Sequence, residues 1–127
     1  MSTPRNALAD RLAAGLPTSV RVVPYARNID APKRPTVMAR VDEVLPHEQA
    51  PTTHRLYRFT AILIASKVAP DGPADDELDA LLQLVLDAVD DDDTMAWTRA
   101  TRATWLDTTL PAYEVAVEVT HKKVSTP

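Results

Sequence analysis

The sequence predicts an α+β fold in which a mostly antiparallel sheet carries helices on one face. Three patterns predict it: strict apolar and polar alternation over Tyr113–Thr120, a broad apolar stripe at helical spacing over Leu78–Val89, and further strand-like runs between proline-rich connections. In chain order the elements are α-β-β-β-α-β-β. Because 127 residues suffice for one hydrophobic core, we expect a single domain over residues 1–127.

The N-terminal part of the sequence contains one helix and two strands. The helix is expected over Pro4–Ala14, with a proline suited to its first turn and a glycine suited to the position after its end. The run Val20–Tyr25 is β-branched, but Pro24 removes a backbone donor, which predicts a short strand or one at a sheet edge. Alternation over Thr36–Leu45 predicts a second strand whose other face, from Met38 onward, is partly wet.

The central part of the sequence predicts the middle of the sheet and the main helix. Pro46–Thr53 is polar and rich in proline, as expected of an exposed hairpin connection. Arg55–Val68 is the longest strand candidate, and Ile62 and Ile64 make its middle apolar on both faces, which predicts a central strand. The turn signal Pro70–Pro73 begins the amphipathic helix, whose apolar stripe is expected to pack on the sheet.

The last two strands are expected to pair as an antiparallel hairpin. The first, Met95–Leu106, carries Trp97 and Trp105 on one face with Arg99 between them. The second, Tyr113–Thr120, directs its valines to a core and its glutamates to water.

The composition excludes several classes of function. A net charge of -4 argues against a protein that grips a phosphate backbone, although DNA could pass nearby. The absence of cysteine removes disulfides, thiolate nucleophiles and cysteine zinc sites. Two glycines leave almost nothing for a phosphate-binding loop. The central apolar run, Ala61–Ala65, is far shorter than the ~20 residues that span a bilayer, and no signal-peptide core is seen, so we expect a protein made in the cytoplasm without a membrane partner.

Two clusters resemble metal ligands. His47 and Glu48 with His54 form a possible zinc set, but the metalloprotease spacing needs a histidine where Pro51 stands, which favours a solvated loop. Asp90–Asp93 offers oxygen ligands for Mg²⁺ or Ca²⁺ but lacks the spacing of an EF-hand loop, which favours a solvated run. We therefore expect neither a metal nor a cofactor.

The acidic run and the following strand also suggest contacts between subunits. Asp90–Asp93 lies at a helix C-terminus, where negative charge is unfavourable unless a cation such as Arg99 or Arg102 neutralises it. The strand that contains these arginines, with Trp97 and Trp105 beside them, has three interpretations: a nucleic-acid platform, an ordinary core strand, or a strand that also meets a partner subunit.

No catalytic constellation is recognisable in the sequence. It contains no nucleophile elbow, no Ser/His/Asp order and no G-x-G-x-x-G motif. The neighbouring carboxylates Asp42 and Glu43 are expected on opposite faces of a strand, where they could not share a substrate. We therefore do not expect an enzyme.

Six segments, together with the order of the elements, carry a resemblance to a known family. They resemble the tail terminator, or tail completion, proteins of long-tailed siphophages, especially phages of actinobacteria. The segments are Asn6–Leu12, Val20–Tyr25, Pro35–Met38, Tyr57–Phe59, Asp76–Leu82 and Tyr113–Val115.

The resemblance implies a virion structural protein without an active site. Such proteins form a homo-hexameric ring on the last ring of the tail tube, end tube polymerisation and offer the joining surface to the head or neck. The implied partners are copies of the chain itself, the major tail-tube protein and neck or connector proteins, at the head-proximal end of the tail.

The residues themselves suggest where such contacts would lie. The proline-rich connection is expected to project towards the tube, and the acidic run to meet the arginine strand of a neighbour. The alternatives are a head-closure or other neck connector protein, a dimeric regulatory domain, or a small α+β ligand-binding domain or enzyme. The candidate interface residues are His47, Glu48, Gln49, Asp91, Asp92, Asp93, Arg99 and Arg102.

Overall fold

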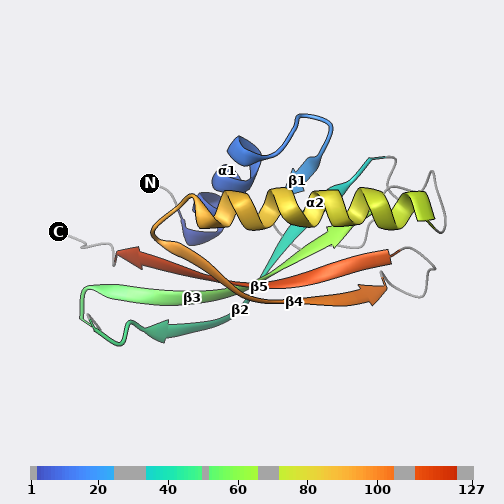
Figure 1. The fold of residues 1–127 in the computed structure, drawn as a ribbon. Coiled ribbons are helices and arrows are strands. Elements are labelled where there is room, and N and C mark those ends of the chain that lie inside the picture. The colour runs from blue at the N-terminus through green and yellow to red at the C-terminus, as the bar shows by residue number, and fades with distance from the viewer. Residues whose placement is uncertain (1–2, 25–33, 50–51, 66–71, 105–110, 123–127) are drawn as a thin grey trace.

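The computed structural model describes residues 3–24, 34–49, 52–65, 72–104 and 111–122, with the backbone alone for 72–75. It confirms the α+β class and the predicted order of elements (Figure 1). The elements are α1 (Pro4–Gly15), β1 (Arg21–Val23), β2 (Thr36–Pro46), β3 (His54–Ile64), α2 (Gly72–Asp90), β4 (Met95–Thr104) and β5 (Pro111–Lys122).

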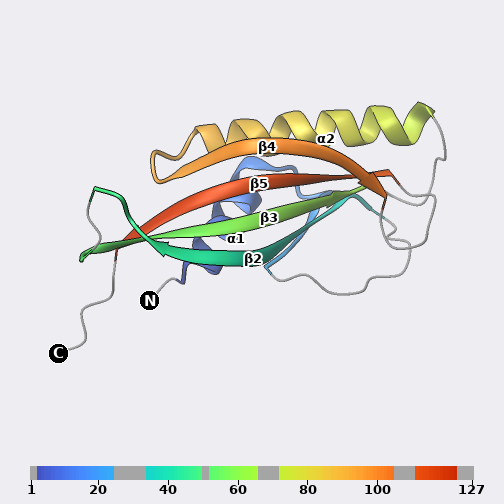
Figure 2. The ribbon, with the colours of Figure 1, turned by 90° about the horizontal axis from the view of Figure 1, so that it is seen from below.

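The five strands form one sheet in the order β1-β2-β3-β5-β4. Only the β1–β2 pair is parallel, and all other neighbours are antiparallel. β3 is the central strand and β4 and β5 are adjacent, as predicted. In Figure 2 the strands lie side by side, with α1 behind β3 and α2 along the β4 edge.

Most strand boundaries match the prediction, and β3 ends earlier. β1 has three residues and lies at an edge, which agrees with the effect of Pro24 on backbone pairing. β3 ends at Ile64 and β4 at Thr104, whereas the sequence predicted ends at Val68 and Leu106; residues 66–68, Trp105 and Leu106 lie outside the described residues.

Helix α1 begins at a capped proline. The side-chain oxygen of Thr3 accepts a hydrogen bond from the backbone N–H of Asn6 at 3.1 Å, and Pro4 occupies the first turn as predicted. Gly15 is the last residue of the helix and not the one after it. A Cβ atom on Gly15 would lie 2.6 Å from the Cβ of Ala88 in α2, so the glycine allows the two helices to approach closely.

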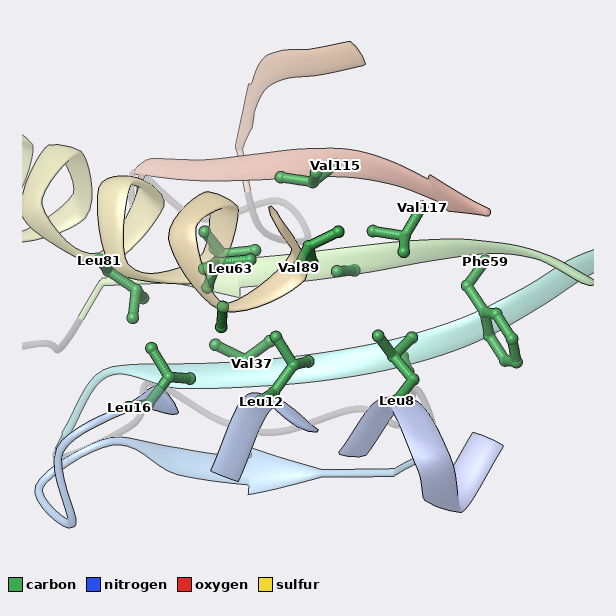
Figure 3. Close-up of a cluster of buried hydrophobic side chains, with 14 of the residues drawn as sticks. Leu8, Leu12, Leu16, Val37, Phe59, Leu63, Leu81, Val89, Val115 and Val117 are labelled. Carbon is green, nitrogen blue, oxygen red and sulfur yellow. The ribbon is translucent and has the colours of Figure 1, made fainter. Parts of the chain in front are cut away.

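The hydrophobic core lies between the two helices and one face of the sheet (Figure 3). Each large side chain fully buried there contributes ~1.5–3 kcal/mol to stability, which agrees with the apolar stripe predicted for α2. Leu82 of that stripe is only partly buried at the border of the core. Fully or almost fully buried members include Leu8, Leu12, Val37, Phe59, Leu63, Leu78, Val85, Val89, Val115 and Val117.

A second, smaller cluster lies on the opposite face of the sheet. Val23, Met38, Ile62 and Ile64 are buried there, next to β1. The two-sided apolar character predicted for β3 is therefore confirmed. The partly wet face predicted for β2 is confirmed, because Met38 is fully buried and Arg40 is exposed.

Two β-bulges interrupt the alternation on which the sequence predictions relied. In β2 the register shifts between Val41 and Glu43, so Asp42 is an extra residue. In β4 it shifts between Trp97 and Arg99, so Thr98 is extra. Side chains that follow each bulge therefore point to the opposite face of the sheet from the one that simple alternation predicts.

Candidate interaction surfaces

The tip of the β2–β3 hairpin holds three predicted interface residues in a polar turn. Glu48 and Gln49 are exposed, and His47 is half-buried. The Nδ1 atom of His47 accepts a hydrogen bond from the backbone N–H of Gln49 at 3.2 Å, so this nitrogen is occupied within the turn. The ring of His54 lies edge-on to that of His47, with centroids 6.2 Å apart. Within the described ranges, no three His, Asp or Glu side chains gather as metal ligands.

The acidic run at the end of α2 is partly used inside the fold. Asp90 accepts a hydrogen bond from Trp97 Nε1 at 3.1 Å. Asp92 accepts one from the backbone N–H of Thr94 at 2.9 Å and one from its hydroxyl at 2.6 Å, which closes the turn into β4. Asp91 and Asp93 are exposed. The carboxylate of Asp92 therefore stabilises the turn between α2 and β4.

Hydrogen bonds and a nearby cation act on the carboxyl of Asp92. The hydroxyl and backbone N–H of Thr94 lower its pKa below the usual 3.8, against a smaller opposing effect of burial. The positive charge of Arg11 in α1 lowers the pKa further. The sequence named Arg99 and Arg102 as neutralisers of this run, but the cation that acts on Asp92 comes from α1, because the two helices cross near this turn.

The bulge at Thr98 places Arg99 on the opposite face from Trp97, and Arg102, three residues after Arg99, lies on the helix side again. Arg102 pairs with Tyr113 on the helix side, where its guanidinium carbon lies 5.4 Å from the centre of the tyrosine ring. Arg99 pairs with Ala116 on the face opposite the helices. The expectation that Trp97 and Arg99 share a face is therefore wrong.

The face opposite the helices, which we call the open face, carries a ladder of ion pairs. Arg58 bonds Glu43 at 2.7 Å and lies 3.7 Å from Glu118 on β5. Arg40 bonds Asp42 at 2.9 Å. Because of the bulge, Asp42 and Glu43 lie on the same face, and the prediction of opposite faces is wrong.

Asp42 is ionised on the open face. Its burial raises the pKa, but hydrogen bonds from the Thr60 hydroxyl and Arg40, together with the charge of Arg40, lower it more, so that the pKa lies below the usual 3.8. Asp42 and Glu43 are each bound to a different arginine. The two carboxylates therefore serve as acceptors in the sheet.

Arg99 lies where two shallow hollows of the open face meet. One hollow, of about 390 Å³, is lined by Asp42, Arg58, Thr98 and Glu118 among others. The other, of about 320 Å³, is lined by residues that include Thr60, Thr101 and Glu114, and Arg99 and Ala116 line both. No ion pair of Arg99 is found among the described residues.

An apolar groove, which we call the hairpin groove, lies on the helix side of the hairpin. Val41 is 39% exposed and Val44 is 49% exposed there. The groove encloses about 210 Å³. Its lining consists of Pro4, Arg5, Val41, Val44, Tyr57 and Phe59.

Element lengths explain why this groove is uncovered. The 11-residue strand β2 extends about 36 Å, whereas the 12-residue helix α1 covers about 18 Å. The hairpin therefore extends past both helices (Figure 1). The groove was not predicted, because valines that alternate along a strand indicate a core. The difference in length between β2 and α1 was the signal that could have revealed it.

A second partly apolar surface, the α2–β4 flank, lies at the opposite edge of the sheet. We define it by Leu82, Leu86, Asp90 and Trp97. The first three follow each other at intervals of four residues along α2, so they share one flank of the helix. Asp90 bonds Trp97, whose side chain is 37% exposed, and both leucines are partly buried.

Comparison with models of known protein families and with curated proteins found no match to this chain. Over the part of the chain that the structure describes, neither helix has the length and apolarity needed to cross a membrane.

Proposed function

We propose that the protein is a virion structural subunit that caps a phage tail tube as a homo-hexameric ring. In this role it ends tube polymerisation and provides the joining surface for the head or neck. The observation that carries the proposal is the hairpin groove, whose valines are exposed because α1 meets the groove only at its first residues, Pro4 and Arg5, and does not cover it. An exposed apolar groove on a projecting element is typical of a surface that another protein covers.

Two further observations support an assembly role. Two arginines of the open face are bound to carboxylates, Arg58 to Glu43 across strands and Arg40 to Asp42 within β2. Among the described residues, two carboxyls, Asp42 and Asp92, have a shifted pKa, and both are shifted downwards, so they are poor proton donors near neutral pH. The resemblance of the segments and their order to tail terminator proteins supplies the specific role.

The proposal assigns contacts to three regions. The hairpin tip with His47, Glu48 and Gln49 faces the tail-tube protein, and the exposed Asp91 and Asp93 contribute to contacts with a neighbouring subunit or with the neck. Arg99 is placed on the open face, away from α2, and is available to a partner there.

The proposal is tested with the tail-tube protein encoded by the same virus. Native mass spectrometry and sedimentation should detect a ring of six 13.9 kDa chains, free or on tubes. When the protein is added during tube assembly, electron microscopy should show shorter tubes with a ring at one end. A monomer at every concentration, with tube growth unchanged, would refute the proposal.

A neck connector protein is the nearest alternative, because it would share the ring. The two are separated by the partner that is bound. Pull-down of purified tail-tube protein supports the tail cap, whereas binding only to the head connector supports the alternative.

A further inference from the structure

We propose that the hairpin groove of one copy receives Trp97 of a second copy, with Asp90 of the second copy facing Arg55 beside the groove. This contact rests on the proposed ring and identifies the two surfaces that join neighbouring subunits. Four observations lead to it: the exposure of the apolar side chains, their position in the sheet, the state of the indole N–H, and the distribution of charge.

Exposure selects the two surfaces. In the described part of the chain, four large apolar side chains are more than a third exposed. Val41 and Val44 belong to the groove, and Trp97, at 37%, is the one aromatic side chain among the four. Leu84, the fourth, lies on α2 away from β4. Tryptophan is enriched at the energetic centres of protein interfaces, because it buries a large area with few rotatable bonds.

The register of the sheet places the two surfaces at the ends of one row. Val41 pairs with Phe59, Phe59 with Val117, and Val117 with Trp97, all on the helix side. Val41 lies on the β2 side of this row and Trp97 at the β4 edge. When copies stand side by side with their sheets in line, Trp97 of one copy therefore comes next to Val41 of the next.

The indole of Trp97 is prepared for burial. Its Nε1 donates a hydrogen bond to Asp90 at 3.1 Å. Entering an apolar groove therefore leaves no unpaired donor, which would otherwise be costly. The hydrogen bond also fixes the carboxylate of Asp90 beside the indole, so the two side chains move into a contact together.

The charges of the two surfaces are complementary. Residues 68–98, which include all of α2, contain ten acidic residues and no lysine or arginine. The groove has Arg5 at its rim, held by hydrogen bonds to the carbonyl oxygens of Pro24 and Ala39 at 3.0 and 3.3 Å. Arg55 is exposed and lies on the same face of β3 as Tyr57. An acidic flank and a basic groove favour this pairing over pairing of like surfaces.

The contact joins two different surfaces and is therefore heterologous. A pair joined in this way still offers one free groove at one end and one free Trp97 at the other, so addition continues until a ring closes. The bulges at Asp42 and Thr98 lie in the two strands concerned and disturb their edges. We therefore assign the contact to side chains and not to a continuous backbone ladder.

Mixing two variants tests the heterologous contact. Val44→Glu places a charge in the groove, and Trp97→Ala removes the inserted side chain; each alone should weaken self-association by about 30-fold or more. Mixed in equal amounts, they should form a dimer of two 13.9 kDa chains and nothing larger, because only one intact contact remains. Leu84→Glu is the matched control, with similar exposure at 36% outside both surfaces, and should assemble like the parent.

A charge exchange tests the same contact without removing the indole. Arg55→Asp and Asp90→Arg should each weaken association, whereas the two single variants mixed should assemble again, because every contact between unlike copies then joins opposite charges. The double variant should regain part of the assembly, because the charge pair is reversed and restored while the indole N–H of Trp97 loses its acceptor. Thermal melts establish that each variant is folded.

The outcomes separate this contact from the proposed function. If Val44→Glu and Trp97→Ala assemble like the parent, the contact is wrong while the ring stands. If the mixture yields no dimer although each variant is folded and defective alone, the pairing of these two surfaces is wrong. If the parent itself never associates, in solution or on tubes, the proposed function fails before the contact is tested.

Discussion

The close crossing of the two helices makes Gly15→Ala a direct test of the packing. The added Cβ would lie 2.6 Å from the Cβ of Ala88, much nearer than two carbon atoms approach, so the helices must separate. Overpacking of this kind costs about 1–3 kcal/mol. Replacing glycine in a helix regains at most about 1 kcal/mol of propensity. We expect a net loss of about 1–2 kcal/mol in the free energy of unfolding.

Thermal and urea unfolding, followed by circular dichroism, measure this loss. For a domain of this length each kcal/mol lowers Tm by about 3–5 °C, so Gly15→Ala should melt about 3–10 °C below the parent. Ala13→Gly is the matched control, because Ala13 is exposed in the same helix and reports propensity without the clash. It should cost about 1 kcal/mol or less.

A double variant separates the clash from other effects. Ala88→Gly removes the opposing Cβ, so Gly15→Ala combined with Ala88→Gly should be more stable than the sum of the single losses predicts, by about 1 kcal/mol or more. An increase in Tm for Gly15→Ala alone, or strict additivity in the double variant, would show that the helices do not meet at this glycine.

Three other substitutions have expected results. Val85→Asp buries an unpaired charge at a fully buried position and should abolish the cooperative melt, whereas Leu84→Asp, one residue away and exposed, should change Tm little. The hydrogen bonds from Thr94 lower the pKa of Asp92 in the folded protein, so its ionised carboxylate stabilises the fold above pH 3.8. This contribution disappears as pH falls through the pKa of the folded state. The Tm advantage of the parent over Asp92→Asn should therefore shrink in melts recorded below about pH 4. Tyr113→Phe should alter the free energy of unfolding, measured with urea, by less than about 0.5 kcal/mol, because its exposed hydroxyl reaches Asp79 only at 3.5 Å; a larger loss would contradict that geometry.

The sequence was sufficient for the order, type and approximate limits of the elements. Alternation in β3 and β5 and the stripe of α2 arise from burial, which acts on every second residue of a strand and on one side of a helix. Pro24 was enough to predict a short edge strand, because it removes a backbone donor. These signals are local, and the structure preserves them.

The candidate interface could be predicted only in part. The bulges at Asp42 and Thr98 come from strand pairing over long distances, so no local pattern revealed them, and each reversed the faces assigned to the residues that follow. The hairpin groove was missed for a related reason. Val41 and Val44 have the pattern of core residues, and only the relative lengths of β2 and α1 show that the described helices do not cover them.

The central ladder of the sheet has a consequence for biosynthesis. β3 pairs with β5 from His54 opposite Lys122 to Ile64 opposite Ala112, so its longest pairing joins residues separated by more than half the chain. Pairing at such separation forms slowly, because a long loop must close first. During translation β3 therefore remains an open edge until nearly the whole chain has left the ribosome. A nonsense mutation within β5 should yield an aggregating polypeptide and not a smaller working protein.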